Sequence, residues 1–148
     1  MAKTRWSGRA AKVSVETSAF TSDPTWVDVG LTRSIAPPPQ ERGSIDLTAM
    51  EDTYAVVRAG IEQESAFTFQ ALHDPEDTTD ALIKTVYGTG ETRKWRIRRT
   101  NGTNDFDSQF DGIVTAIRPQ GYSGSDPVMM EVQVHRKSAI THAVQAVT

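Results

Sequence analysis

The sequence contains no cysteine, which excludes disulfide bonds, thiolate metal sites and cysteine nucleophiles. It also lacks any run approaching the roughly 18 apolar residues that a membrane-spanning helix needs. Positive charge is not in excess, since 16 Lys and Arg residues stand against 19 Asp and Glu residues and the formal net charge is −3. No overall positive field therefore draws the protein to nucleic acid or to an anionic membrane. These absences predict a soluble protein without redox chemistry.

The length of 148 residues fits one domain of ordinary size. Hydrophobic residues make up 37% and charged residues 24% of the chain, which is enough apolar material for a core and excludes a fully disordered chain. The first residues are basic but lack the apolar segment of a secretory signal, so we expect folding in the cytoplasm. A single domain is predicted over 1–148, with an N-terminal arm over 1–11 and a C-terminal tail over 137–148.

Short runs of alternating polar and apolar residues dominate the chain, as is typical of half-buried β-strands. Such runs occur at 12–16, 26–31, 44–48, 65–72 and 128–135. Residues 36–43 contain three consecutive prolines, which remove hydrogen-bond donors and fix φ. This stretch is predicted as an extended loop that leads into the strand at 44–48, so that loop and strand together span 36–53. Residues 49–60 are compatible with strand or helix, and Gly60 is expected to end the element.

One helix is predicted over 75–87. Asp74 can serve as its N-cap, Pro75 suits the first helical position, and Asp77 occupies the capping-box position. Gly88 can take the left-handed conformation that ends many helices. The apolar side chains at helical spacing would form one stripe that covers a sheet face: Leu82, Ile83, Val86 and Tyr87.

A β-hairpin is predicted over 93–117, because Asn101-Gly102 between two alternating runs is typical of a two-residue type I′ turn. A two-residue loop pairs Arg98 with Asp105 and Arg96 with Asp107 on one face. Each such ion pair contributes about 0.2–1 kcal/mol. The other face then holds the apolar pair Ile97 and Phe106. Gly112, further along, is expected to mark a bulge or bend. With six or seven short strands and one helix, the chain is predicted to be mainly β, as a sandwich or a partly closed barrel.

No group of residues has the spacing of a known catalytic or metal site. The aspartates Asp105, Asp107 and Asp111 resemble part of a calcium loop, but Phe110 stands where the EF-hand pattern needs glycine. No spaced pair typical of zinc ligands is formed by the three histidines: His73, His135 and His142. We therefore expect no metal, no cofactor and no enzymatic activity.

One run of cations leaves a nucleic-acid-binding β-barrel open as an alternative. Cations around an aromatic platform are typical of single-strand-binding proteins, and here Trp95 lies among Arg93, Lys94, Arg96, Arg98 and Arg99. Against this alternative, two of these arginines have expected carboxylate partners. The side chain of Trp95 also points to the opposite face from Arg96 and Arg98.

The order of these features resembles the major tail tube proteins of long-tailed, siphovirus-type bacteriophages and related gene-transfer particles. The resemblance covers about residues 10–138. It rests on the extended loop before Asp46-Leu47-Thr48, the glycine at 60, the aromatic strand, Asp74-Pro75 opening a helix, and the arginine-rich strand. The segment Phe110-Asp111-Gly112-Ile113-Val114-Thr115 completes the series.

The resemblance implies two packed antiparallel sheets flanked by one α-helix, in a tail-tube-like fold. It implies that six copies form a ring and that rings stack into a hollow tube, which conducts the genome into the host. The implied partners are other copies of the chain, a tape-measure protein in the lumen, a tail terminator, baseplate or distal tail proteins, and genomic DNA in transit. The implied location is the virion tail, assembled in the host cytoplasm, with no role for a membrane. A tail terminator or head–tail component of the same fold is the main alternative.

Two sets of residues are predicted to matter in such a tube. A wall that lets DNA slide should be negative, and the candidates to face the lumen are Glu62, Glu64 and Asp111, with Asp46 as a weaker one. A proline-rich and polar loop is suited to order on contact with the next ring. Its candidate residues are Pro37, Pro38, Pro39, Glu41, Arg42, Glu51 and Asp52.

Overall fold

The computed structural model describes residues 7–17, 25–30, 32–120, 124 and 127–146. The strands are β1 (Ser7–Glu16), β2 (Trp26–Asp28), β3 (Thr32–Ala36), β4 (Arg42–Asp46), β5 (Val57–Glu62), β6 (Ala66–Leu72), β7 (Arg93–Thr100), β8 (Asn104–Pro119), β9 (Met129–Arg136) and β10 (Thr141–Ala146), with one helix, α1 (Thr78–Thr89). The predicted mainly β fold with one flanking helix is confirmed.

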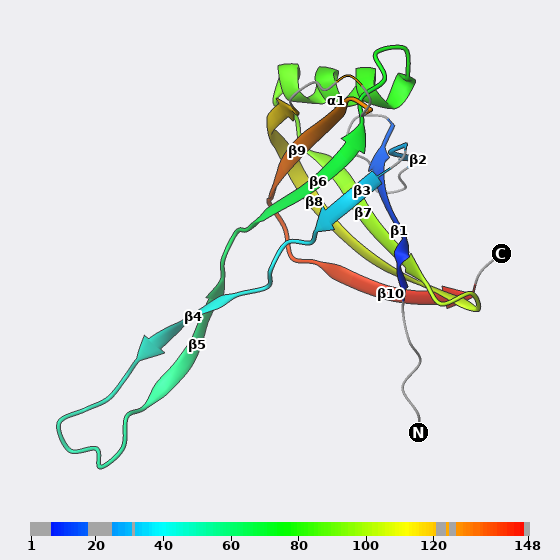
Figure 1. The fold of residues 1–148 in the computed structure, drawn as a ribbon. Helices are drawn as coiled ribbons and strands as arrows, with labels where there is room; N and C mark the ends of the chain where they lie inside the picture. Colours follow the sequence, from blue (N-terminus) through cyan, green and yellow to red (C-terminus); the bar gives the residue numbers. More distant parts are fainter. Residues whose placement is uncertain (1–6, 18–24, 31, 121–123, 125–126, 147–148) are drawn as a thin grey trace.

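The strands form two antiparallel sheets (Figure 1). The larger one has the order β2-β1-β7-β8-β9-β6-β3 and curls until β3 approaches β1, which gives a partly closed barrel. The long strand β8 pairs with β10 through its first half and with β9 through its second half. The smaller sheet is the β4–β5 hairpin, which projects from the barrel. We call residues 42–62 the arm.

The core of the barrel follows from the period-two alternation of its strands. Trp95 and Ile97 on β7 alternate with partly exposed arginines. On β6, the buried Phe67 and Phe69 alternate with partly exposed polar residues. The rings of Phe67, Trp95 and Phe110 meet in edge-on contacts at centroid distances of 5.6–6.5 Å. α1 lies across one end of the curled sheet (Figure 1) and buries Ile83 and Val86.

The helix lies later in the sequence than the predicted 75–87. Asp77, not Asp74, is the N-cap, and its side chain accepts from the Thr79 N–H. Asp74 instead accepts from the Glu76 N–H in a preceding turn. The helix ends at Gly90 in the left-handed conformation rather than at Gly88. Asp77, predicted at the capping-box position inside the helix, thus caps it instead.

The β7–β8 hairpin has a different register from the predicted one. Arg98 faces Asp107 rather than Asp105, and Arg96 faces Gln109 rather than Asp107. The turn is longer because the Asn101 side chain accepts hydrogen bonds from the N–H groups of residues 103 and 104, at 2.9 and 2.7 Å. The partner of Arg98 is displaced by two residues along β8, from Asp105 to Asp107. Because side chains alternate between faces with a period of two, every side chain keeps its predicted face.

Both predicted end segments extend a sheet over part of their length. β1 begins at Ser7, within the predicted arm 1–11, and residues 1–6 lie outside the described residues. β10 occupies most of the predicted tail 137–148 and pairs with residues 104–109 of β8. All side chains of β10 are exposed, so the strand has no buried face that would produce a recognisable alternation.

Gly112 does not mark a bulge, because it pairs regularly with β7 and β9, and the register shift in β8 lies between Val114 and Ala116. The glycine instead permits close packing. A Cβ at this position would lie 2.5 Å from Val134 Cγ1 and 3.3 Å from Trp95 Cδ1.

We expect Gly112→Ala to lower the free energy of unfolding by about 1–3 kcal/mol, because the added methyl group overpacks the core. Urea denaturation measures the change. The matched control is Gly88→Ala on α1, where nothing lies within 4 Å of the added Cβ. The control should be neutral or slightly stabilising, since alanine favours a helix. Equal stability of the two variants would contradict this role of Gly112.

Candidate assembly interface

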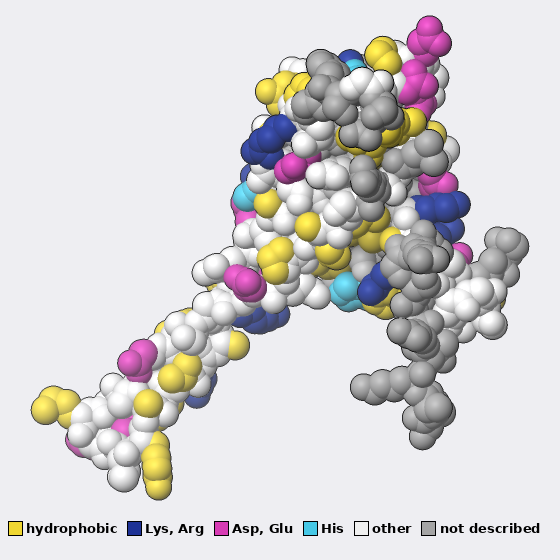
Figure 2. All heavy atoms as spheres, in the orientation of Figure 1, with side chains coloured by type: hydrophobic (Ala, Val, Ile, Leu, Met, Phe, Trp, Pro, Cys, Tyr) yellow, Lys and Arg dark blue, Asp and Glu magenta, His cyan; other side chains and the backbone are white. Residues whose placement is uncertain are grey.

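The arm exposes most of the large apolar side chains on the surface. Of nine exposed large hydrophobic residues in the described part of the chain, seven belong to the arm: Ile45, Leu47, Met50, Tyr54, Val56, Val57 and Ile61. Figure 2 shows this apolar material spread along the projecting hairpin, while the barrel carries a more mixed surface. Such a concentration marks an interaction surface.

Apolar side chains occupy both faces of the arm. Ile45 lies opposite Arg58 in the register, and Val57 lies opposite Asp46, so Ile45 and Val57 point to opposite faces. By the same alternation Leu47 belongs to the first face. Ile61, further along β5, is 88% exposed. A two-stranded hairpin alone in water is at best marginally stable. The arm therefore needs a partner, and its pattern suits one that covers both faces.

The root of the arm is held by a buried arginine. Arg136, at the end of β9, is only 2% exposed. Its Nη1 lies 2.8 Å from Glu62 Oε1 and also donates to the Ser138 carbonyl. Its Nη2 donates to the carbonyls of Gln63 and Pro39, and its Nε donates to the Ser65 hydroxyl. One guanidinium thus ties both ends of the arm to the barrel.

Two further contacts fix the direction of the arm at its root. The Gln63 N–H donates to the Glu41 carbonyl at 2.8 Å, and the Ser65 hydroxyl donates to the Pro39 carbonyl at 2.8 Å. Gly60 does not end the element as predicted but lies within β5. Its backbone passes so close to β4 that a Cβ would lie 2.8 Å from the Gly43 carbonyl oxygen. The arm therefore leaves the barrel in one defined direction.

The far end of the arm is a turn ordered by carboxylates. Asp46 accepts from the Thr48 N–H at 2.9 Å, and Asp52 accepts from the Ala49 N–H at 2.7 Å. The hydrogen bonds from Thr48, first from its side chain and then from its backbone, lower the pKa of Asp46. Because this pKa is depressed, the ionised form of Asp46 stabilises the turn. The stabilisation is lost as the pH falls through the pKa of Asp46.

The structure does not gather the four candidate lumen carboxylates. Glu62 lies in the arm root against Arg136. Glu64 contacts His135 at 2.6 Å and Lys137 at 3.8 Å, and the hydrogen bond with His135, followed by the charge of Lys137, lowers the pKa of Glu64. Asp111 is near this root, since its N–H donates to the Ser138 hydroxyl, whereas Asp46 lies out along the arm. Two of the four are thus partly neutralised by cations of β9 and the segment after it.

The candidate stacking loop is divided between the two ends of the arm. Pro37, Pro38 and Pro39 lie at the root, with Pro38 buried, and Glu41 joins them there through its carbonyl. Arg42 begins β4, and Glu51 and Asp52 lie in the exposed turn at the far end. These residues remain a prediction for the stacking contact, and the sequence does not reveal that Arg42–Asp46 among them is a paired strand.

The cationic run on β7 offers no base-stacking platform. Trp95 is fully buried. Arg98 makes a bidentate contact with Asp107 at 2.7 and 2.9 Å and lies 3.8 Å from Asp105, and hydrogen bonding to Asp107 raises the pKa of Arg98. The other arginines with carboxylate contacts are Arg93 with Glu91, and Arg96 with Asp28 at 3.9 Å. A nucleic-acid site of the predicted kind is therefore not formed here.

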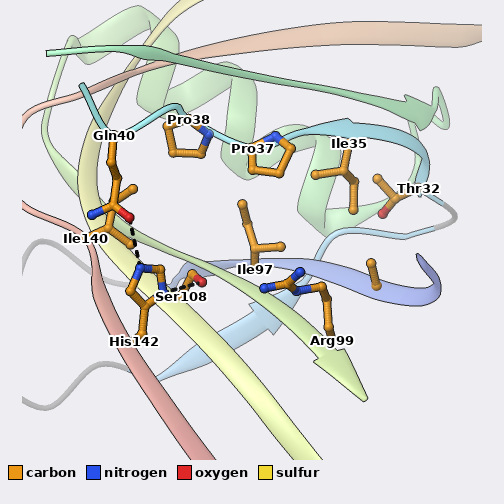
Figure 3. A pocket seen from close by; sticks show the side chains of 11 residues that line it. Thr32, Ile35, Pro37, Pro38, Gln40, Ile97, Arg99, Ser108, Ile140 and His142 are labelled. Carbon is orange, nitrogen blue, oxygen red and sulfur yellow. Dashed lines mark hydrogen bonds between the residues drawn. The ribbon is translucent and has the colours of Figure 1, made fainter. Parts of the chain in front are cut away.

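A cavity of about 620 Å³ opens in the barrel near the arm root (Figure 3). Ile35, Pro37 and Pro38 line one side, and Ile97 and Ser108 line the other. His142 lies at one end, where its ring nitrogens contact Ser108 Oγ at 2.9 Å and Gln40 Oε1 at 3.2 Å. Six of the eleven lining residues are apolar and five are polar, a mixture that suits a bound side chain or small group with both apolar and polar atoms.

Neither a cluster of metal ligands nor a membrane-spanning helix occurs in the described residues. Among them, no three His, Asp or Glu side chains lie close enough together to bind a metal ion. Within the same residues, no helix is both long and apolar enough to cross a membrane.

No family model and no curated protein sequence matches the chain, but solved structures resemble its fold. A chain from the tail of an empty gene transfer agent particle with C6 symmetry has a TM-score of 0.71 at 13% identity, covering 93% of this chain and 98% of the other. A chain of the sheath/tube terminator of an extracellular contractile injection system has a TM-score of 0.70 at 14% identity, covering 99% and 100%. A chain of the sheath–tube complex of that kind of system has a TM-score of 0.66 at 14% identity, covering 95% and 91%.

The protein thus has a tail-tube-like fold, as the sequence resemblance predicts. Sequence reasoning missed Arg136, the apolar faces of the arm and the cavity. The arm could have been found from the apolar residues on either side of the polar turn 49–53. The role of Arg136 had no sequence signal, because its partners Glu62, Gln63 and Pro39 are 73 to 97 residues away in the chain.

Proposed function

We propose that the protein is the structural subunit of a tail tube, in which six copies form a ring and rings stack into a hollow conduit for a genome. The observation that carries the proposal is the arm, which exposes apolar residues on both faces and is held rigidly at its root. A surface of this kind on one copy must meet a different surface on another copy. Such heterologous contacts build rings and filaments.

The similar structures support this proposal through their assemblies. One belongs to a tail with C6 symmetry, and others belong to a sheath–tube complex and a tube terminator. Free strand edges add support. In the described structure β2, β3 and β10 each pair along one edge only. Joining such edges between copies would protect them from uncontrolled aggregation.

Negative-stain microscopy of the purified protein tests the proposal, and we expect stacked rings that lengthen into tubes. The same experiment separates the alternative of a tail terminator, which the similarity to the tube terminator favours. A tube subunit elongates without limit, whereas a terminator stops at one ring. A monodisperse monomer at high protein concentration would contradict both functions.

The proposed partners follow from this role: other copies of the chain, a tape-measure protein within the lumen, a terminator, and baseplate or distal tail proteins. DNA would pass through without being held, because a negative wall repels phosphate. Of the three candidates near the arm root, Glu64 and Asp111 can be changed without breaking the contact between Glu62 and Arg136.

We expect tubes of Glu64→Lys/Asp111→Lys to assemble normally but to retain at least about tenfold more labelled double-stranded DNA at low salt than unmodified tubes. Each added cation attracts phosphate, and the attraction weakens with salt. The control is Glu76→Lys, an exposed position beside α1. Equal DNA retention by the double variant and the control would show that these two carboxylates do not line the lumen.

A further inference from the structure

The cavity near the arm root has a distinct electrostatic character. None of the eleven residues that line it is Asp or Glu, whereas Arg99 and His142 are among them. Arg99 forms no ion pair within the described residues, and its guanidinium lies over the Phe106 ring at 4.7 Å from the ring centroid. The cavity therefore combines apolar side chains with a cation that, within the part of the chain that the structure describes, has no carboxylate partner.

The floor of the cavity continues as an open sheet face. In the registers, Phe106 lies opposite both Arg99 on β7 and Val144 on β10, so the three side chains share this face. The imidazole of His142 stacks on Phe106 at a centroid distance of 5.4 Å. Val144 is 62% exposed and is one of only two large exposed hydrophobic residues outside the arm among the described residues. Cavity and face together form a docking surface of mixed apolar and cationic character.

The end of the arm has the complementary chemistry. Met50 is fully exposed and Tyr54 is 83% exposed, so the turn presents two large apolar side chains to solvent. Residues 43–57 contain Asp46, Glu51 and Asp52 but no Lys or Arg. The arm end is thus apolar and negative, while the docking surface is apolar and positive.

We propose that the cavity receives the arm end of a second copy of the chain, with Met50 and Tyr54 in the apolar interior and Glu51 near Arg99. The occupant belongs to another copy, because the arm projects away from its own barrel (Figure 1). A knob on one surface and a socket on another form a heterologous contact, which propagates through an assembly. This inference rests on the proposed function and names the surfaces that join its subunits.

Cysteine cross-linking tests the contact, since the natural chain has no cysteine. Thr53→Cys places a thiol in the arm turn and leaves Met50 and Tyr54 in place. Ser108→Cys places a near-isosteric thiol in the cavity floor. With a short bis-maleimide reagent, assembled protein carrying both substitutions should give a ladder of covalent dimers, trimers and longer chains. The matched control combines Thr53→Cys with Lys84→Cys on the exposed face of α1 and should give mainly monomer.

Charge reversal gives an independent test that does not depend on thiol geometry. Arg99→Glu should raise the protein concentration needed for assembly at least about tenfold, because it places like charges together. Glu51→Arg should do the same, and the two changes combined should restore most of the assembly. Lys84→Glu, a charge reversal away from the cavity, should have no effect.

The outcomes separate this inference from the proposed function. A ladder with the first cysteine pair and rescue by the combined charge reversal would establish the contact. Normal tubes that give only monomer with the first pair, and no effect of Arg99→Glu, would overturn the docking and leave the tube function standing. Failure of the cysteine-free protein to form any ring or tube would overturn both.

Discussion

Replacing residues 47–56 by Asn-Gly is expected to yield a folded protein that no longer assembles. Asp46 and Val57 are paired at the ends of this segment, so a two-residue turn can close the shortened hairpin. The change removes four of the seven exposed apolar side chains of the arm: Leu47, Met50, Tyr54 and Val56. We expect the concentration needed for polymerisation to rise at least about 100-fold, since each factor of ten corresponds to about 1.4 kcal/mol of contact free energy.

Light scattering and negative-stain microscopy measure the loss of assembly, and thermal unfolding measures the integrity of the barrel. The barrel should unfold close to the temperature of the unmodified protein, because the shortening removes only exposed residues beyond the arm root. Tyr87→Ala serves as a control that removes an exposed aromatic residue from α1 and should leave assembly intact. Tubes formed by the shortened protein would show that the arm is dispensable.

Arg136→Met is expected to lower the free energy of unfolding by about 3 kcal/mol. Removing one partner of a buried ion pair typically costs about 3–5 kcal/mol, and the lower end applies because Glu62 keeps some contact with solvent. The variant also leaves the carbonyls of Gln63 and Ser138 without their Arg136 donor. Because these groups hold both ends of the arm, we expect assembly to be impaired even at temperatures where the barrel is folded.

The matched control is Arg118→Met, which removes an exposed arginine whose nearest contact with Glu131 is 3.5 Å. Exposed pairs of this kind contribute at most about 1 kcal/mol. Urea denaturation gives the two free energies, and sedimentation gives the extent of assembly. Equal decreases in the free energy of unfolding of the two variants would show that Arg136 contributes no more than an exposed arginine and does not anchor the arm.

The sequence predicts the barrel strands well where one face is buried. Trp95 and Ile97 alternate with arginines, and Phe67 and Phe69 alternate with polar residues, so the period of two is plain. β10 escapes prediction because neither of its faces is buried. The position of β10 in the sheet depends on backbone hydrogen bonds to β8, and these do not require any particular residue types in the strand.

The candidate interface is predicted only in outline. The sequence singles out the segment from the prolines to Asp52 as a candidate contact, but it does not show which part is paired strand and which is turn. The hairpin register differs because the Asn101 side chain captures two backbone N–H groups, a local choice that a turn motif alone does not determine. The contacts of Arg136 with Pro39 and Glu62 depend on the folded topology, because these residues are far from Arg136 in the sequence.

Amide hydrogen exchange of residues 44–61, compared between dispersed subunits and the assembled protein, tests the central idea most directly. If neighbouring copies complete the arm, its amides should exchange rapidly in the dispersed subunit and become at least about 100-fold slower after assembly. The core amides of β7 and β9 should be protected in both states. Equal exchange of the arm in the two states would mean that it remains in solvent, and the account of how these molecules join would be wrong.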